Sequence, residues 1–229
     1  MNNLVIFGTS TTAETICKFV LYHKLFNVIG FVVDKKEFEI FMDLPVYNLS
    51  ELNEKANFDK DKDFLFVAIQ WNYLNKIRRN VYERLKSEGY KFANIISPNA
   101  LIYGNLEGDN CWISDFVIIE NDSFIGSNVY IKTKAYIAHY CNIDNHCFIG
   151  ANSFIAGAVK IGEQSFIGIS SNIFDDLRIG KKCLIGACTI VKRDMSDFSS
   201  IKTNNEGQFI KQYTEEDIES KLVSSRNVR

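Results

Sequence analysis

Three histidines, His23, His139 and His146, are the side chains of this chain best suited to move a proton near neutral pH, because the unperturbed pKa of imidazole is about 6.5. His23 falls at the end of a predicted helix, where a cation stabilises the helix terminus, so we assign it no chemical role. His139 and His146 are therefore the candidate acid–base groups, and their use depends on the elements that hold them.

A second set of polar residues follows short apolar runs in the first half of the chain. Residues 4–7, 28–33 and 64–69 predict strands, and an apolar stripe from residue 13 to 21 predicts a helix after the first of them. A second helical stripe follows the third strand, with one face formed by Leu74, Ile77, Val81 and Leu85. Strands that alternate with helices form a small parallel sheet, which binds ligands beyond the carboxyl ends of its strands. The residues at those ends are Gly8 to Thr11, Asp34, and Gln70 to Asn72.

The first of these strand ends allows two interpretations. A helix that begins near Thr11 presents free N–H groups, which can hold a phosphate. A dinucleotide-binding fingerprint needs three glycines, and only Gly8 is present, so an ordinary turn between strand and helix is the alternative.

The two later histidines lie inside a repeat of six residues. The residue two places before each repeated isoleucine is small or slim, except at Leu177, and the residue after it is often glycine. Isoleucine occupies thirteen consecutive repeat positions: 113, 119, 125, 131, 137, 143, 149, 155, 161, 167, 173, 179 and 185. Val191 extends the series by one repeat.

A period of six fits neither a helix nor a single extended strand. It fits very short strands joined by tight turns, in which residues two apart share the inward face. Three such strands make one coil of 18 residues, so the isoleucine series predicts about four stacked coils of a β-helix solenoid. We expect glycine to ease the backbone at the corners between strands.

The same register places the histidines and the cysteines. His139 is two residues past Ile137, and His146 is three past Ile143, so both fall at corners, where we expect the imidazoles to reach solvent or a partner. No Cys-x-x-Cys is present, so we expect no metal site and no disulfide. Four cysteines occupy the small inward position, where a free thiol packs as a compact hydrophobe: Cys111, Cys141, Cys147 and Cys183.

The residue before each isoleucine points outward, and the coil period sorts these residues into three faces. The first face carries Trp112, Tyr130, Phe148, Phe166 and Leu184. The second carries Ile118, Tyr136, Phe154, Asn172 and Ile190, and the third carries Phe124, Asn142, Lys160 and Arg178. Two apolar faces form a patch too large for a monomer, so we expect a homotrimer; burial beneath the N-terminal half or the tail is the alternative.

Composition and charge exclude several classes of protein. The 229 residues are 46% hydrophobic and 24% charged, proportions that exclude a disordered chain or a collagen-like fibre. The net charge of −2 is scattered without a basic stripe, so we expect no nucleic acid partner. No apolar run approaches the ~18 residues of a membrane span, and the first residues do not form a signal sequence. We therefore expect a cytoplasmic protein without membrane insertion.

The isoleucine array resembles the left-handed β-helix acyltransferases. The βαβ pattern before it narrows the resemblance to the bacterial sialic-acid O-acetyltransferase and amino-sugar N-acetyltransferase group. The resemblance covers residues 3–195 and is carried by Lys86-Ser87-Glu88-Gly89-Tyr90, Ile96-Ser97-Pro98-Asn99-Ala100 and Tyr136-Ile137-Ala138-His139-Tyr140-Cys141-Asn142-Ile143. It implies an α/β Rossmann-like domain at residues 1–92 and a left-handed parallel β-helix at 93–195. In place of the family's usual ending, we expect a polar tail at 196–229 with one short helix near 215–222.

The resemblance also implies an activity. It implies transfer of an acetyl group from acetyl-CoA to the amino group of a nucleotide-activated amino sugar, as in the synthesis of surface polysaccharide such as lipopolysaccharide O-antigen. His139 matches the general base, and no metal is implied. The positions that match contacts to coenzyme A are Gly157, Ile169 and Ala187. Those that match the nucleotide-sugar region are Ser10, Thr11, Asp34 and Gln70.

Two departures from the family pattern leave parts of this picture open. The family often has an acidic residue directly after the catalytic histidine, where this chain has Tyr140. Phe148 stands where some members carry a second histidine that contacts the cofactor. The partner that orients the imidazole is therefore undetermined. O-acetylation of a sugar such as sialic acid is the alternative activity, and a β-helix scaffold without catalysis is the alternative class.

Overall fold

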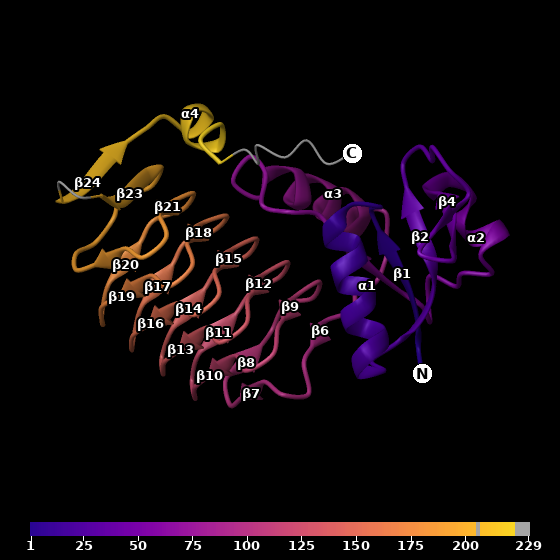
Figure 1. The fold of residues 1–229 in the computed structure, drawn as a ribbon, viewed down its shortest axis with the longest axis horizontal. Helices are drawn as coiled ribbons and strands as arrows, with labels where there is room; N and C mark the ends of the chain where they lie inside the picture. The colour runs from indigo at the N-terminus through magenta and orange to yellow at the C-terminus, as the bar shows by residue number, and fades with distance from the viewer. Residues whose placement is uncertain (205–206, 223–229) are drawn as a thin grey trace.

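The computed structural model describes residues 1–204 and 207–222 and places a small sheet domain beside a long β-helix (Figure 1). The sheet has the strand order β3-β4-β2-β1-β5, and its β1–β2, β1–β5 and β2–β4 pairs are parallel. The three strands and two helices predicted from sequence are present. The elements are β1 (Asn3–Phe7), α1 (Thr11–His23), β2 (Asn27–Val33), β3 (Ile40–Phe41), β4 (Leu44–Asn48), the 3-10 helix η1 (Leu49–Glu51), α2 (Leu52–Lys55), β5 (Phe64–Val67) and α3 (Lys76–Ser87).

Each face of this sheet has its own apolar core, because alternate residues of a strand point to opposite faces. Leu4 and Ile6 of β1 pack with α1 and with aromatic residues of the β-helix. Val5 and Phe7 pack on the other side with α3 and the segment around α2. The carboxyl ends of β1 and β5 therefore lie between two packed layers.

Helix α3 departs from the predicted apolar stripe. It buries Arg78, Tyr82 and Leu85, whereas Ile77 is 40% exposed. Arg78 donates hydrogen bonds to three backbone carbonyl groups of the β-helix and lies 3.9 Å from the ring centroid of Tyr130. The helix thus packs on the β-helix as well as on the sheet, which explains why a polar residue occupies its buried face.

The second half of the chain forms the predicted left-handed parallel β-helix. Each two-residue strand pairs with the equivalent strand of the next coil, and the strands form three sheets. Every isoleucine of the repeat is at most 2% exposed. The strands are β6 (Ile95–Ile96), β7 (Leu101–Ile102), β8 (Asn105–Leu106), β9 (Trp112–Ile113), β10 (Ile118–Ile119), β11 (Phe124–Ile125), β12 (Tyr130–Ile131), β13 (Tyr136–Ile137), β14 (Asn142–Ile143), β15 (Phe148–Ile149), β16 (Phe154–Ile155), β17 (Lys160–Ile161), β18 (Phe166–Ile167), β19 (Asn172–Ile173), β20 (Arg178–Ile179), β21 (Leu184–Ile185) and β22 (Ile190–Val191).

The glycines that follow the isoleucines serve a purpose different from the predicted one. The left-handed backbone conformation falls three residues after each isoleucine, on residues such as Tyr140 (φ 59°). A Cβ on Gly150 would lie 2.6 Å from the backbone nitrogen of Ile169, and a Cβ on Gly168 would lie 2.5 Å from that of Ala187. Glycine is therefore needed for the close stacking of successive coils.

The first three residues of the first outer face are covered, so the prediction that this part of the face mediates self-association is wrong. Trp112, Tyr130 and Phe148 are 5%, 1% and 6% exposed, because they pack against α1 and the sheet of the N-terminal domain. The Tyr130 hydroxyl donates to the carbonyl oxygen of Val67 at 2.5 Å. The second face stays open, with Phe154 43% exposed.

The tail continues the first sheet of the β-helix. Strand β23 (Ser199–Asn204) pairs parallel to β21, and β24 (Gly207–Gln212) pairs antiparallel to β23. The predicted short helix is α4 (Glu215–Glu219), where the Glu219 carboxylate accepts hydrogen bonds from Lys76 of α3 and from Lys182 of the β-helix. The helix thus contacts both domains, on the side of the β-helix where α3 lies (Figure 1). Residues 223–229 of the predicted tail lie outside the described residues.

Within residues 1–204 and 207–222, none of the helices has the length and apolar character needed to cross a membrane.

Candidate active site

His139 lies at the corner that follows β13, with its side chain 58% exposed. Its backbone N–H donates to Glu120 Oε2 at 2.9 Å, and its Nδ1 lies 3.2 Å from the same oxygen. The imidazole and the carboxylate line an open groove together with Tyr103, Ile118, Asn121, Asp122 and Tyr140. The groove exposes the imidazole to a ligand from solvent.

Glu120 fixes which nitrogen of His139 carries the hydrogen. The Tyr136 hydroxyl donates to Glu120 Oε1, and this bond, followed by the bonds from His139, holds the pKa of Glu120 below its ordinary value. An ionised carboxylate only accepts hydrogen bonds, so Nδ1 of His139 carries the hydrogen in the neutral ring. Nε2 then has a free lone pair and can accept a proton.

Gly157 lies directly beside that lone pair. A Cβ at this position would be 2.9 Å from His139 Nε2 and 3.1 Å from Cε1, although the Gly157 backbone does not adopt the left-handed conformation. The absence of a side chain therefore keeps Nε2 accessible. Of the three residues expected to contact coenzyme A, Gly157 is the one that the fold brings to His139.

Glu120 is the contact of His139 that the sequence analysis missed. It directly follows Ile119, so it occupies the same corner as His139 one coil earlier in the stack. The family pattern directs attention to the residue after the histidine, where Tyr140 stands. The signal that could have found Glu120 was the coil period, because it pairs Ile119 with Ile137 and so brings the residues that follow them together.

Ile169 and Ala187 lie on a different corner of the same chain. They occupy equivalent places in successive coils, between β18 and β19 and between β21 and β22, and Ile169 is 55% exposed. The second outer face separates this corner from the one that holds His139. One copy of the chain therefore does not bring these two residues to the imidazole.

Ser10, Thr11 and Gln70 meet at the carboxyl ends of β1 and β5, as predicted. Gln70 Nε2 donates to Thr11 Oγ1 at 3.3 Å, and Ser10 is the residue that precedes the first turn of α1. Thr11 and Gln70 line a cavity of ≈ 190 Å³ between α1 and the first face of the β-helix. This arrangement places polar donors above the sheet edge.

Asp34 lies apart from these three residues. Its carboxylate accepts two hydrogen bonds from Arg84 Nη2, at 2.7 and 3.0 Å, and lines a separate hollow with Ser50, Lys60 and Tyr90. The structure therefore divides the predicted nucleotide-sugar residues between two hollows.

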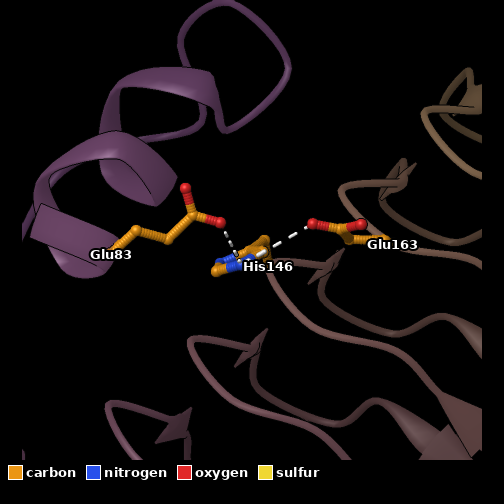
Figure 2. A group of neighbouring side chains, drawn as sticks. All are labelled: Glu83, His146 and Glu163. Atoms are coloured by element: carbon orange, nitrogen blue, oxygen red, sulfur yellow. Dashed lines mark ion pairs between the residues drawn. The ribbon is translucent and has the colours of Figure 1, made fainter. Parts of the chain in front are cut away.

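The prediction that His146 reaches solvent or a partner is wrong. Its side chain is 5% exposed, because α3 covers this corner of the β-helix. Nε2 lies 3.5 Å from Glu83 Oε1 of α3 and 3.8 Å from Glu163 Oε1 of the next coil, as Figure 2 shows. Burial, with smaller contributions from Arg78 and Arg79, lowers the pKa of His146 to about 3.

A column of buried polar residues, Asn110, Asn128 and His146, sets the tautomer of this second imidazole. Asn110 Oδ1 accepts from the backbone N–H of Val67 at 2.8 Å, so Asn110 Nδ2 donates to Asn128 Oδ1 at 2.7 Å. Asn128 Nδ2 then donates to His146 Nδ1 at 2.9 Å, which leaves the hydrogen of the neutral ring on Nε2.

The tautomer of His146 decides whether its Nε2 offers a lone pair to a metal ion. The ligand atoms of Glu83, His146 and Glu163 lie within 4.8 Å of one another, the spacing of a metal site. Nε2 carries a hydrogen there and points toward the two carboxylates, and the Arg79 guanidinium lies 3.0 Å from Glu83 and 3.8 Å from Glu163. The group therefore acts as a polar contact between the domains.

Comparison with known families finds a match inside the β-helix. Residues 122–157 match the bacterial transferase hexapeptide family (six repeats). A search of curated proteins finds no significant match.

Several solved structures are similar over nearly the whole chain. PerB from Caulobacter crescentus, in complex with CoA and GDP-perosamine, is 25% identical, with a TM-score of 0.78 over 92% of this chain and 98% of that one. A variant of the perosamine N-acetyltransferase of the same organism is 24% identical, with a TM-score of 0.79 over 93% and 98% of the chains. The acetyltransferase domain of PglB from Neisseria gonorrhoeae is 20% identical, with a TM-score of 0.77 over 93% and 100%. The chain therefore contains a hexapeptide transferase repeat domain and shares the two-domain fold of sugar acyltransferases of that family.

Proposed function

We propose that the protein is an acyltransferase that moves an acetyl group from acetyl-CoA to the amino group of a nucleotide-activated amino sugar. The observation that carries the proposal is the pair of His139 and Glu120, which leaves Nε2 of the imidazole free to accept a proton beside Gly157. The similar proteins crystallised with CoA and GDP-perosamine support this substrate class.

In the proposed reaction, His139 Nε2 takes a proton from the amino group as its nitrogen bonds to the thioester carbonyl carbon. Glu120 stabilises the imidazolium that results, through the hydrogen bond to Nδ1. Collapse of the tetrahedral intermediate breaks the C–S bond, and the proton held by His139 passes to the leaving thiolate. The products are an N-acetylated sugar nucleotide and coenzyme A, so atoms and charge balance.

The proposal includes a homotrimer and a cytoplasmic setting for polysaccharide synthesis. Ile169 and Ala187 lie one corner away from His139 in the same chain, across the apolar second face. A second copy packed on this face would bring its own Ile169 and Ala187 toward His139 of the first copy. Coenzyme A would then lie between the two copies. Ser10, Thr11, Gln70 and Asp34 are the proposed contacts to the nucleotide sugar.

The test is acetyl-CoA turnover with a panel of amino sugars linked to UDP, dTDP, GDP and CMP. Thiol release gives the rate, and mass spectrometry of the product distinguishes an amide from an ester. We expect His139→Ala to lower kcat at least about 100-fold while KM for acetyl-CoA stays within a few-fold, because a base acts mainly in the transition state.

His146→Asn is the matched control, because it removes the buried histidine at a corner that the reaction does not use. We expect its kcat to stay within about threefold of wild type. Equal losses in the two variants, or an ester as the only product, would contradict the proposed reaction.

A further inference from the structure

Lys132 lines the cavity between α1 and the first face of the β-helix. Its Nζ is 3.1 Å from the ring centroid of Trp112, and no carboxylate in residues 1–204 or 207–222 pairs with it. Burial lowers the Lys132 pKa to about 7, which reflects the cost of an ammonium group withdrawn from water. An anion in this cavity would remove that cost.

The same cavity receives the start of α1. Thr11, Thr12 and Thr15 line it, and the first backbone bond inside the helix runs from Glu14 N–H to the Ser10 carbonyl. The N–H groups of Thr11 and Thr12 therefore have no partner within the helix, and they carry the positive end of its dipole.

Trp112 forms part of the wall of the same cavity. It is 5% exposed, and its ring lies against the Lys132 ammonium group. Among the described residues, the lining contains one lysine and no carboxylate. A cation without a carboxylate partner and a helix start thus meet in one hollow, which is the donor set of an anion site.

We propose that this cavity binds the diphosphate group of the nucleotide sugar, with Lys132 as its cationic partner. The inference rests on the proposed function for its substrate and adds a residue of the β-helix to a site otherwise formed by the N-terminal domain. The volume of ≈ 190 Å³ is below the ~300–1,000 Å³ of sites that enclose a drug-sized ligand. The cavity therefore fits a compact charged group, while base and sugar extend outside it.

The experiment measures binding through tryptophan fluorescence, because the only two tryptophans of the chain, Trp71 and Trp112, both line the cavity. The ligands are inorganic pyrophosphate, UDP, GDP, uridine, guanosine and acetyl-CoA. We expect Lys132→Met to weaken binding of pyrophosphate and of both nucleoside diphosphates by about 10- to 100-fold. Binding of the two nucleosides and of acetyl-CoA should stay unchanged.

Lys134→Met is the matched control, because Lys134 is an exposed lysine two residues farther along the same coil and outside the cavity. It should bind every ligand as wild type does. Lys132→Arg keeps the charge and should retain pyrophosphate binding within a few-fold.

A second measurement on the wild-type protein does not depend on the folding of a variant. Trace acetic anhydride labels the lysines, mass spectrometry maps the label, and pyrophosphate should protect Lys132 but not Lys134. Unchanged diphosphate binding by folded Lys132→Met, or a failure of pyrophosphate to protect Lys132, would overturn the inference.

The outcomes separate the two proposals. If no nucleotide sugar is acetylated but pyrophosphate binding needs Lys132, the anion site stands and the proposed function is wrong. If a sugar nucleotide is acetylated and its KM is the same in Lys132→Met, the proposed function stands and the anion site is wrong.

Discussion

The imidazole of His139 occupies the space that a side chain on Gly157 would need, since a Cβ there would lie 2.9 Å from Nε2. The two residues belong to successive coils of the same corner, and the carbonyl oxygen of His139 accepts a hydrogen bond from the N–H of Ala158 at 2.9 Å. The glycine therefore maintains access to one nitrogen atom, whereas Gly150 maintains contact between two backbones.

Gly157→Ala should lower kcat by at least about tenfold, because the methyl group displaces the imidazole from its position beside the substrate. The melting temperature should change little, since the displaced group is an exposed side chain. Gly150→Ala is the contrasting variant. Its Cβ would meet the backbone nitrogen of Ile169 at 2.6 Å, so it should lower the melting temperature clearly. A folded Gly157→Ala with wild-type kcat would contradict the assigned role.

Glu120→Gln should lower kcat by at least about tenfold, with KM for acetyl-CoA within a few-fold, because the amide cannot stabilise the imidazolium of His139 as a carboxylate does. Steady-state kinetics of purified protein separate the two parameters. A rise in KM alone would mean that Glu120 acts in substrate binding.

Two further variants test whether Glu120 acts by positioning His139. Tyr136→Phe removes one hydrogen bond to the carboxylate and should give a smaller loss of kcat than Glu120→Gln. Glu163→Gln alters the carboxylate near the buried histidine and should leave kcat within about twofold, because no catalytic group contacts it. Equal losses for the Glu120 and Glu163 variants would point to a general structural effect.

The sequence predicted the β-helix accurately because its period is set by local sterics. Each isoleucine must point inward, and this requirement repeats every six residues whatever the rest of the chain does. The corner position of His139 follows from the same register. The role of the glycines did not follow, because it depends on contacts between stacked coils, whose atoms are distant along the chain.

The errors concern contacts between residues far apart along the chain, two of them between the domains and one within the N-terminal domain. An outward tyrosine or phenylalanine has the same local pattern whether it faces solvent, a second copy or another domain, so the burial of Tyr130 was not readable from the repeat. His146 is at a corner, as predicted, but α3 covers that corner. The position of Asp34 depends on the distant residue Arg84, which the strand pattern does not reveal.

His146→Asn should reduce the acid sensitivity of the fold. The pKa of His146 is lowered from 6.5 to about 3, so between these values the unfolded chain binds more protons than the folded one. The contribution of the neutral His146 ring to the free energy of unfolding is fully present above pH 6.5. It is lost as the pH falls toward 3, at up to about 1.4 kcal/mol per pH unit. Asparagine suits the left-handed backbone at this position (φ 63°) and can accept the hydrogen bond from Asn128.

Urea unfolding at pH 7, 5.5 and 4.5 measures this effect. The free energy of unfolding of wild type should fall more steeply with acid than that of His146→Asn. The control is His139→Asn, which removes an exposed histidine and should keep the wild-type slope. Equal slopes for wild type and His146→Asn would mean that another group controls acid unfolding.

We expect a homotrimer, because the second outer face is apolar and exposed in the single chain. Tyr136 and Phe154 stack on it with ring centroids 4.7 Å apart and an interplanar angle of 2°, and Phe154 and Ile190 are 43% and 40% exposed. Light scattering at micromolar concentration should give three times the mass of one chain. Phe154→Lys should reduce that mass to one chain and abolish turnover, because Ile169 and Ala187 of a second copy would no longer reach His139.

Phe124→Lys is the matched control, since Phe124 is 40% exposed but lies on the polar third face, and this variant should remain a trimer. A monomeric wild type would refute the trimer, and a trimeric Phe154→Lys would refute the assignment of this face.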